Sequence, residues 1–397
     1  MSTFEVKVVR IDSVDHHPDA DRLSIIKIGG YNCISAKLED GSHRYSAGDL
    51  VVYIPEAAIL PEWLLKKMEF WKDDRGTLAG SKGDRVKAIR LRGIFSQGVL
   101  YSLDCSLDGE QHYITAYDNE THTRQQFVKE DSDVAEFLGI TKYEPPIPVH
   151  MAGEVSGANT EYSFHYDIES IQKYDKVLEI GEDVVVTSKR HGTFCCLAYA
   201  PDLNDLEFLN GKFFAASKGL LAKGLLLKNN EANANNVYNK FLHSKNDDGT
   251  MMTDILIRIS EFFGNQTIYI FGEIFGRGIQ DLTYQLEFPR LEIFDIYVGK
   301  PNVGRYLNDA ELDSVLQNIA GLKRVPILYR GPFNINKMIE LRDGNDIIDG
   351  QTINQIREGI VIRSSVERKN KWIGRVQLKF ISPAYILRKN ANATEYQ

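Results

Sequence analysis

The sequence predicts an α+β protein of two domains, a β-rich N-terminal domain and a C-terminal domain in which strands and helices alternate. With 397 residues, 43% of them hydrophobic, the chain is long enough for two domains. Short strands between Gly and Asp turns fill roughly the first hundred residues, which is typical of a small Greek-key barrel. From about Ser163 onward, β-branched runs alternate with helical patterns, which indicates a largely antiparallel core with flanking helices.

The β-rich region runs from Phe4 to about Leu103. Its segment HPDADRLSIIKIGG resembles the start of the OB-type domains that bind tRNA and other nucleic acids, so we expect an OB-like barrel. A helix is expected over residues 60–70. Strands are expected over residues 4–11, 23–28, 34–36, 50–54, 86–91 and 98–101.

A basic segment, SKGDRVKAIRLRGIFSQG, closes the β-rich region. On a strand, Arg85 and Lys87 share one face, and Arg90 and Arg92 share the other. With Phe95 nearby, this pattern suits a track for a phosphate backbone with a residue that stacks on a base. The alternative is a solvated edge strand with protective charges. We predict that these four basic residues contact nucleic acid, although the net charge of −8 argues mildly against it.

Residues 107–157 become polar and then Pro-rich, with YEPPIPVHMAG near the end. This composition predicts a linker with one small helix near residues 133–138. We therefore expect residues 1–145 to form the OB-like nucleic-acid-binding domain with its linker. Residues 146–397 are expected to form the second domain.

Bulk features predict a cytoplasmic protein without a membrane partner. No run approaches the roughly 18 apolar residues of a membrane helix, and the start, MSTFEVKVVRID, lacks the apolar region of a signal peptide. The spacing of the four cysteines fits neither a zinc site nor a disulfide framework, so reduced, partly buried thiols are expected. These cysteines are Cys33, Cys105, Cys195 and Cys196.

The second domain is expected to mix strands and helices. Its expected strands cover residues 184–189, 267–271, 291–298, 359–363 and 375–381. Its expected helices cover residues 237–243, 253–263, 309–319 and 335–340.

In the stretch VVVTSKRHGT, a β-branched run leads into Lys189 and then Gly192. The run predicts a strand, and glycine permits a tight turn close to a ligand, so the amine at the strand end is expected to face a cavity. This pattern alone is a weak signal, because most lysines are solvated. Four later stretches add charged or aromatic residues beside β-runs: IYIFGEIFGRG with Glu273, LEIFDIYVG with Phe294, REGIVIRSS with Glu358 and RVQLKF with Lys379.

In order along the chain, KRHG, FGEIFG, IFDIYV, EGIVIR and QLKF resemble motifs I, III, IIIa, IV and V of the covalent nucleotidyltransferases, which include polynucleotide ligases and mRNA-capping enzymes. The KxHG and FGExxG forms are similar to those of ATP-dependent RNA ligases, and AASKGL, with Lys218, resembles motif Ia. An OB-like region before the catalytic domain and a short tail after motif V favour an RNA ligase. The resemblance implies a ligase-type nucleotidyltransferase domain that uses ATP with Mg²⁺ or Mn²⁺.

The resemblance implies three steps. Lys189 attacks the α-phosphorus of ATP, releasing pyrophosphate and leaving lysyl-AMP. The AMP then moves to an RNA 5′-phosphate, and finally a 3′-hydroxyl attacks that activated phosphate and AMP leaves. A lysine with a pKa of about 10.4 is only about 0.04% neutral at pH 7, so cationic neighbours or a metal are expected to lower its pKa. The implied partner is RNA with 3′-hydroxyl and 5′-phosphate ends in a duplex, bound by a monomer.

Further roles follow from the resemblance. Lys379 suits the α-phosphate. Phe294 suits stacking on adenine, with plain core packing as the alternative. Glu273 and Glu358 are expected to hold the metal, directly or through water, with a ribose hydrogen bond as the alternative for Glu273. His191 is expected to support the first step, with a satisfied turn histidine as the alternative.

The nucleotide-binding set includes Lys218, which the resemblance implies would face the nucleotide or the RNA 5′-phosphate, with a helix-end or loop charge as the alternative. Relatives commonly have Arg there, and lysine is monodentate by comparison. Ser188 stands where RNA ligases often have a Glu that reads the adenine amino group. The expected nucleotide-binding residues are Lys189, Ser188, Gly192, Lys218, Glu273, Phe294, Glu358 and Lys379.

A second departure is Gln377, because many relatives have a lysine two residues before Lys379. One phosphate-binding group is therefore missing or supplied elsewhere, for example by Arg375. Cys195 and Cys196 follow the turn on a strand, and we expect them to pack in the core.

The leading hypothesis is an ATP-dependent RNA ligase that repairs nicks or breaks. A DNA ligase or a GTP-using capping enzyme is a second hypothesis, against which the missing C-terminal domain argues. A non-catalytic RNA-binding protein on a ligase fold is the third. The presence of Lys189, Glu273, Glu358 and Lys379 argues against it.

Overall fold

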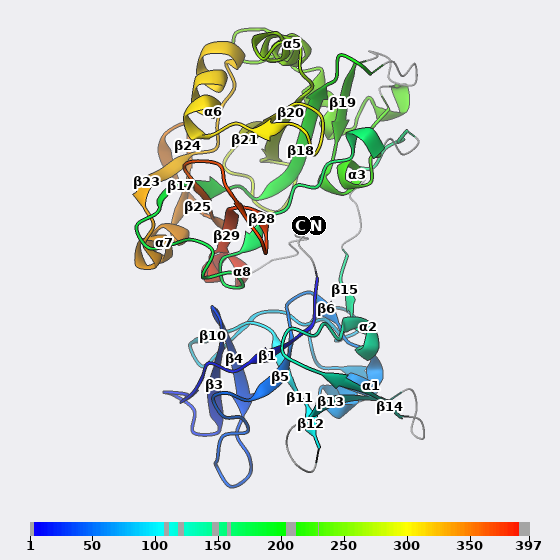
Figure 1. The fold of residues 1–397 in the computed structure, drawn as a ribbon, viewed down its shortest axis with the longest axis vertical. Helices are drawn as coiled ribbons and strands as arrows, with labels where there is room; N and C mark the ends of the chain where they lie inside the picture. The colour runs from blue at the N-terminus through cyan, green and yellow to red at the C-terminus, as the bar shows by residue number, and fades with distance from the viewer. Residues whose placement is uncertain are drawn as a thin grey trace. The chain divides into compact units, whose positions relative to one another are not determined.

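The computed structural model describes residues 4–106, 111–117, 123–144, 151–156, 160–203, 212–228 and 230–388. The chain forms two compact units, which we call the N-terminal unit and the C-terminal unit (Figure 1). The N-terminal unit comprises Thr3–Glu144 together with Gln172–Asp175. The expected boundary at residues 145 and 146 lies outside the described residues.

Two three-stranded antiparallel sheets form the centre of the N-terminal unit, in the orders β1-β5-β11 and β2-β3-β4. Buried aliphatic side chains such as Val8, Val52 and Ile26 fill the space against these sheets. The strands are β1 (Lys7–Arg10), β2 (Ser13–His16), β3 (Leu23–Ile28), β4 (Tyr31–Ala36), β5 (Leu50–Ile54) and β11 (Val99–Ser102). The strands predicted over residues 23–28 and 50–54 are confirmed as β3 and β5.

The remaining elements of this unit are short. They are β6 (Ala58–Ile59), α1 (Glu62–Lys67), β7 (Trp71–Lys72), β8 (Arg75–Gly76), β9 (Ile89–Leu91), β10 (Ile94–Ser96), β12 (Asp104–Cys105), β13 (His112–Tyr117), β14 (Thr123–Val128), α2 (Ala135–Leu138) and β15 (Thr141–Lys142). The helices predicted over residues 60–70 and 133–138 correspond to α1 and α2.

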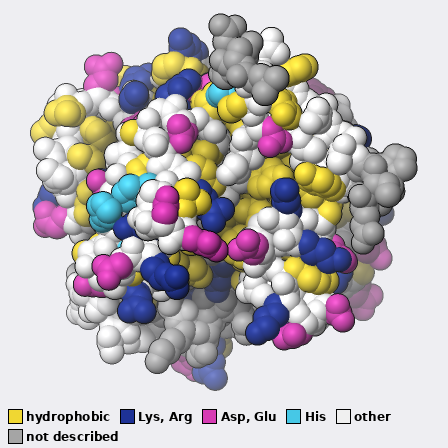
Figure 2. Space-filling view, turned by 90° about the horizontal axis from the view of Figure 1, so that it is seen from below, with side chains coloured by type: hydrophobic (Ala, Val, Ile, Leu, Met, Phe, Trp, Pro, Cys, Tyr) yellow, Lys and Arg dark blue, Asp and Glu magenta, His cyan; other side chains and the backbone are white. Residues whose placement is uncertain are grey.

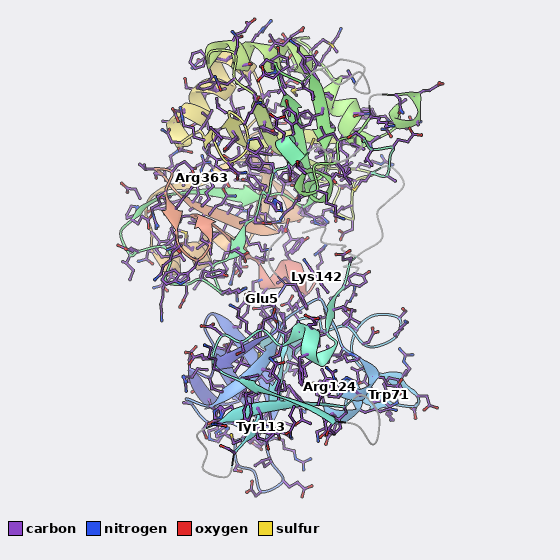
Figure 3. All side chains as sticks on the ribbon, turned by 45° about the vertical axis from the view of Figure 1, so that its right-hand side comes forward. Glu5, Trp71, Tyr113, Arg124, Lys142 and Arg363 are labelled. Carbon is purple, nitrogen blue, oxygen red and sulfur yellow. The ribbon has the colours of Figure 1, made fainter. Side chains whose placement is uncertain are left out.

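The predicted linker was wrong over residues 112–117 and 123–128, where β13 and β14 form an antiparallel pair. The sequence of β14, TRQQFV, lacks the apolar alternation that predicts a strand. All of its residues except the last are exposed, so the strand does not need an apolar face. Tyr113, which is labelled in Figure 3, is the cross-strand neighbour of Phe127, and their ring centroids lie 6.4 Å apart. On β13, Ile114 and Ala116 are buried in the core of the unit.

The C-terminal unit contains two five-stranded sheets. The first sheet has the order β16-β29-β26-β17-β23, and every pair is antiparallel except β16 with β29. The second sheet has the order β19-β18-β20-β21-β22 and is antiparallel throughout. The largely antiparallel α+β core predicted for this part of the chain is therefore confirmed.

The first sheet consists of β16 (Glu169–Ser170), β17 (Asp183–Lys189), β23 (Ile327–Pro332), β26 (Gly359–Ser364) and β29 (Gln377–Ile381). The second consists of β18 (Gly192–Tyr199), β19 (Phe213–Ala216), β20 (Ile268–Phe275), β21 (Arg290–Val298) and β22 (Arg305–Tyr306). Two-stranded pairs are formed by β24 (Asn345–Ile348) with β25 (Gln351–Ile356) and by β27 (Lys369–Asn370) with β28 (Gly374–Arg375).

Helices cover one face of the second sheet, where α5 and α6 lie (Figure 1). The helices of the unit are α3 (Lys218–Ala222), α4 (Val237–Leu242), α5 (Met252–Phe262), α6 (Asp309–Val315), α7 (Ile335–Arg342) and α8 (Pro383–Ile386). A π-helical turn over Leu316–Ala320 continues α6, and short 3-10 turns occur at Thr160–Tyr162 and Glu231–Asn233. The four predicted helices correspond to α4, α5, α6 and α7. Among the helices of the described residues, none combines the length and hydropathy needed to cross a membrane.

Two different cores lie on the two faces of the second sheet. The helical side is aliphatic and includes Cys195, whereas the opposite side is aromatic and includes Cys196. Both cysteines are fully buried on β18, which confirms their predicted packing role. The aromatic side carries Tyr166, Phe194 and Phe271, whose rings lie within 6 Å of one another.

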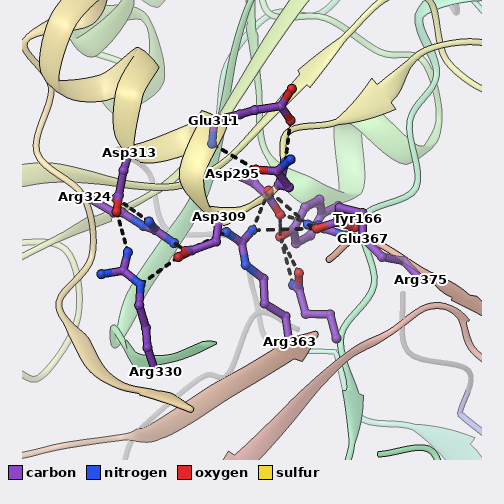
Figure 4. A network of polar contacts seen from close by, with 12 residues as sticks. Tyr166, Asp295, Asp309, Glu311, Asp313, Arg324, Arg330, Arg363, Glu367 and Arg375 are labelled. Atoms are coloured by element: carbon purple, nitrogen blue, oxygen red, sulfur yellow. Dashed lines mark hydrogen bonds and ion pairs between the residues drawn. The ribbon is translucent and has the colours of Figure 1, made fainter. Parts of the chain in front are cut away.

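Buried Asp295, on β21, joins the two sheets of the C-terminal unit (Figure 4). Its carboxylate accepts hydrogen bonds from Arg363 on β26 at 3.2 Å and from Arg375 on β28 at 3.1 Å. The hydroxyl of Tyr166 donates to the same carboxylate at 2.6 Å and accepts from the amide of Gln377 on β29 at 2.9 Å. Removing one member of such a cluster leaves buried charges without their partner.

We expect Asp295→Asn to lower the free energy of unfolding of the C-terminal unit by about 3 kcal/mol, because the amide cannot neutralise Arg363 and Arg375. Glu340→Gln is the matched control, since Glu340 pairs with Lys337 on the exposed surface of α7. Its effect should stay within about 0.5 kcal/mol. Urea denaturation followed by circular dichroism measures both, and equal stability of the two variants would contradict the role given to Asp295.

Candidate active site

Lys189 ends β17 at the point where the chain crosses from the first sheet to the second. Lys189 pairs with Gly359 on β26. Two residues earlier on β17, Thr187 pairs with Val361 of β26. Val361 in turn pairs with Lys379 on β29. Directly paired residues and alternate residues of a strand share a face, so Lys189 and Lys379 project from the same face of the sheet. They are two strands apart, about 10 Å across the sheet, and about 7 Å apart along it. Two long lysine side chains can converge over that span.

Glu358 immediately precedes β26, and its carboxylate forms an ion pair with the Lys189 amine. The glutamate side chain is buried, whereas 21% of the lysine side chain is exposed. Gly359 permits this arrangement, because a Cβ atom at that position would lie 2.3 Å from the carbonyl oxygen of Phe380. The strands beside the lysine therefore pack too closely for any other residue type at position 359.

Glu273 lies on β20, where it pairs with Phe194 on β18, and its carboxylate accepts a hydrogen bond from the backbone N–H of Gly192. Burial raises the pKa of Glu273 to about 8, with Lys189 opposing the rise and Glu358 adding to it. Two carboxylates and one amine therefore interact in one desolvated region. The structure brings together Lys189, Glu273 and Glu358 from three separate stretches of sequence.

Phe294 is the extra, unpaired residue of a β-bulge in β21. Ile293 and Ile296 both belong to the aliphatic, helix-facing core, so the alternation of the strand breaks between them. Phe294 consequently faces the aromatic side, where its ring lies 5.4 Å from that of Tyr166 and 6.0 Å from that of Phe194. It remains partly exposed, as a residue that stacks on a base must be.

Gly192 begins β18, beside Glu273. A Cβ atom at this position would lie 2.1 Å from the carbonyl oxygen of Ile274, so only glycine fits between the strands. The side-chain amide of Gln280 donates to the Gly192 carbonyl.

His191 is buried, and both of its ring nitrogens have side-chain partners. Nε2 lies 2.6 Å from the carboxylate of Asp281, and Nδ1 lies 2.6 Å from the hydroxyl of Tyr385. Burial opposes ionisation of Asp281, but hydrogen bonds from His191 and Arg388 hold its pKa below the ordinary value. The imidazole is therefore held in one orientation, which fits a residue that positions the turn after Lys189.

Lys218 begins α3, whose first turn is capped by the hydroxyl of Ser217. Its amine lies 3.4 Å from the carboxylate of Asp167. It also acts electrostatically on Glu273, which locates it near the other charged residues.

Ser188 and Gln377 are the two departures from the ligase pattern. Both side chains form buried hydrogen bonds within the C-terminal unit. The hydroxyl of Ser188 donates to Asp346 at 2.6 Å, on the face of β17 opposite to Lys189. Gln377 bonds Tyr166, as described above. Arg375 pairs with Asp295 and Glu367, so its guanidinium is engaged away from a phosphate. The Ser188 side chain therefore points away from Lys189, and the Arg375 guanidinium, although it lies beside Asp295, is bound by carboxylates.

Sequence reasoning missed the support of the turn that follows Lys189. The fully buried guanidinium of Arg190 donates to Glu292 at 2.7 Å and lies 2.8 Å from Asp346. The backbone N–H of His191 donates to the hydroxyl of Tyr284 at 2.6 Å. Arg190 was visible in KRHG, but its partners lie about a hundred residues or more away, where no local pattern marks them.

The basic residues of the N-terminal unit do not share two strand faces as predicted, because the strand covers only Ile89–Leu91. Arg92 and Gly93, both with positive φ, instead form the two-residue turn between β9 and β10. Arg90 is the cross-strand neighbour of Phe95, so these two side chains share a face. Lys87, Arg90 and Arg92 are exposed.

Arg85 differs from the other three, since its guanidinium lies 4.2 Å from the ring centre of Tyr143. On the face drawn in Figure 2, basic and acidic side chains are interspersed.

Comparison with known proteins identifies the class. Residues 182–381 match the RNA ligase family model, which covers half of the chain, and residues 5–103 match an OB-fold domain model. The chain belongs to the RNA ligase family. No curated protein sequence matches it.

Solved structures of Naegleria gruberi RNA ligase share the fold. A lysine-to-alanine mutant with ATP and Mn has 21% sequence identity and a TM-score of 0.67, over 96% of this chain and 98% of that one. The structure with PPi has 22% identity and a TM-score of 0.68, over 97% of this chain and 98% of that one. The predicted fold, an N-terminal OB domain before a ligase-type domain, is confirmed.

In metal-free buffer, we expect the free energy of unfolding to fall as the pH rises from about 5 to about 8. The pKa of Glu273 is about 8 in the folded protein and ordinary when unfolded, so the folded state holds the proton more tightly across this window. The contribution of Glu273 to the free energy of unfolding is complete below the pKa of the unfolded state and is lost as the pH passes the pKa of the folded state. Glu273→Gln should flatten the profile, and urea denaturation across this range in the presence of a chelator measures it. The same pH slope in variant and wild type would disprove the assignment.

Proposed function

We propose that the protein is an ATP-dependent RNA ligase that joins an RNA 3′-hydroxyl to a 5′-phosphate through lysyl-AMP and adenylylated-RNA intermediates. The observation that carries the proposal is the position of Lys189, which contacts Glu358, lies near Glu273 and shares a sheet face with Lys379. Relatives of the same fold were solved with ATP and Mn, with AMP and Mn, or with PPi.

In the first step, the Lys189 amine attacks the α-phosphorus of ATP and pyrophosphate leaves. Glu358 is the carboxylate positioned to take the proton from the attacking amine, because the two groups are already in contact. Lys379 is proposed to bind the α-phosphate, where negative charge grows in the transition state. His191 is proposed to support this step by holding the turn that follows Lys189 through its bonds to Asp281 and Tyr385.

Adenine is proposed to stack on Phe294, which the bulge of β21 presents on the aromatic side of the second sheet. With the Ser188 hydroxyl bound to Asp346, no side-chain contact from that residue reads the base. Lys218 is proposed to bind a phosphate of the nucleotide or of the RNA end.

The residues present fit a divalent metal ion. Glu273 and Glu358 interact electrostatically across a desolvated region, and a neighbouring carboxylate contributes to the raised pKa of Glu273. Mg²⁺ and Mn²⁺ favour such oxygen ligands, with waters and substrate phosphates completing the coordination shell. Among the described residues no group of three or more metal-ligating side chains occurs, so substrate oxygens would supply the remaining ligands. When bound, the metal would offset phosphate charge.

The later steps transfer AMP to an RNA 5′-phosphate and then join that phosphate to a 3′-hydroxyl. We propose that the substrate is a nicked or broken duplex and that the reaction serves RNA repair. We also propose a monomer, acting in the cytoplasm, in keeping with the four free cysteines.

Incubating the protein with Mg²⁺ and α-labelled ATP or GTP separates this proposal from its alternatives. We expect acid-stable label on the protein from ATP, lost in Lys189→Ala and retained in the control Lys337→Ala on α7. The reason is that the phosphoramidate forms on Lys189 alone. Label from GTP would instead indicate a capping-type enzyme, and no label would indicate an RNA-binding protein without catalysis.

The N-terminal unit is proposed to be a separate nucleic-acid-binding domain that ends near residue 145. Deleting residues 1–145 should preserve lysine adenylylation and weaken sealing of a nicked duplex, because the basic β9–β10 hairpin is removed with the domain. Arg90→Ala with Arg92→Ala should lower sealing in the same direction within the full chain. Sealing assays on 5′-phosphorylated nicks measure both, and undiminished sealing by both proteins would count against the proposal.

A further inference from the structure

The connection between β26 and β29 carries an exposed aromatic and basic tip, which the nucleotide chemistry leaves unused. The tip is formed by Lys369, Lys371 and Trp372 at the turn of the β27–β28 hairpin. Trp372 is 61% exposed, and both lysines are exposed. A single exposed apolar residue needs no explanation, so the argument depends on its surroundings.

The charges around Trp372 fit a polyanion. The Lys371 amine lies over the indole ring, 4.5 Å from the ring centre, while the Trp372 side chain remains mostly exposed. Among the described residues, neither Lys369 nor Lys371 has an acidic ion-pair partner, whereas Arg368 and Arg375 at the hairpin base are neutralised by glutamates. A stacking ring flanked by uncompensated amines is the arrangement that binds the bases and phosphates of a nucleic acid strand.

The hairpin base is rigid. Arg375 bonds Glu367 and Asp295, and its guanidinium lies 3.6 Å from the ring centre of Tyr306. Arg368 forms two hydrogen bonds with Glu182, at 2.7 and 2.6 Å. At the tip, the backbone N–H of Trp372 donates to the side chain of Asn370 at 2.9 Å. A preorganised tip loses less conformational entropy when it binds a ligand.

The hairpin also emerges beside the proposed site. Arg375 bonds Asp295, which directly follows Phe294, and Trp372 is three residues from Arg375, a span of at most about 10 Å. Lys379 lies two residues after Gln377, which begins β29 at the hairpin end, whereas Gly359 begins β26 at the end away from the hairpin. An RNA end held at the nucleotide would therefore have its neighbouring nucleotides within reach of the tip.

We propose that the β27–β28 hairpin binds the RNA strand next to the break, with Trp372 stacking on a base and with Lys369 and Lys371 binding phosphates. This inference rests on the proposed function, because the substrate it concerns is the RNA to be sealed. It assigns RNA binding to the catalytic unit itself, in addition to the OB domain.

The test measures, by fluorescence anisotropy, the binding of the full-length protein to an end-labelled nicked RNA duplex. Trp372→Ala should weaken affinity roughly 5- to 100-fold, as for other bases stacked on aromatic rings. Trp372→Phe, which keeps a stacking ring, should retain most of the affinity. Phe262→Ala is the control, because Phe262 is 63% exposed at the end of α5.

Lys369→Ala with Lys371→Ala should weaken binding and reduce the slope of log affinity against log salt by about 0.9 for each duplex phosphate that the variant no longer binds. Every variant should keep lysine adenylylation near the wild-type level. Wild-type affinity in Trp372→Ala, or no RNA binding by the wild-type protein, would overturn the inference. Absence of lysine adenylylation together with weaker RNA binding by Trp372→Ala would overturn the proposed ligase reaction but support the hairpin contact.

Discussion

The register of three neighbouring strands determines the candidate site. Pairing of β17 with β26 sets Lys189 opposite Gly359, and pairing of β26 with β29 places Lys379 on the same face. A shift of one residue in either pair would turn one lysine to the other face of the sheet. The close approach at Gly359 and the buried cluster around Asp295 hold these strands in place.

Burial of the candidate site strengthens the electrostatic interactions among its charged side chains. Glu273 and Glu358 lie close enough to influence each other, and burial raises the pKa of Glu273 to about 8. An acidic pair in such surroundings favours a cation, whether a lysine amine or a metal ion. Electrostatic stabilisation of a phosphoryl transfer is strongest where water is excluded. The same burial that raises the pKa of Glu273 would therefore favour catalysis.

The sequence allowed the strand-end lysine, its main partners and both domain types to be predicted, because each is a local pattern. β-branched runs predicted β17 and β26, and Gly192 was expected to permit a tight turn after Lys189, whereas the close strand approach at Gly359 is seen only in the structure. The bulge at Phe294, the partners of Arg190 and the role of Gln377 could not be predicted, since each depends on residues from distant segments. β14 was missed because its side chains are exposed on both faces. The exposed Trp372 is visible in the sequence, but only the hairpin and its neutralised base distinguish it from an ordinary surface residue.

The central claim is that the Lys189 amine carries the nucleotide. The most direct measurement is mass spectrometric peptide mapping after incubation of the protein with ATP and Mg²⁺. The account predicts one adenylyl group on the peptide that contains Lys189, removed when pyrophosphate is added. An adduct on any other lysine, or none on a protein that still seals RNA, would contradict it.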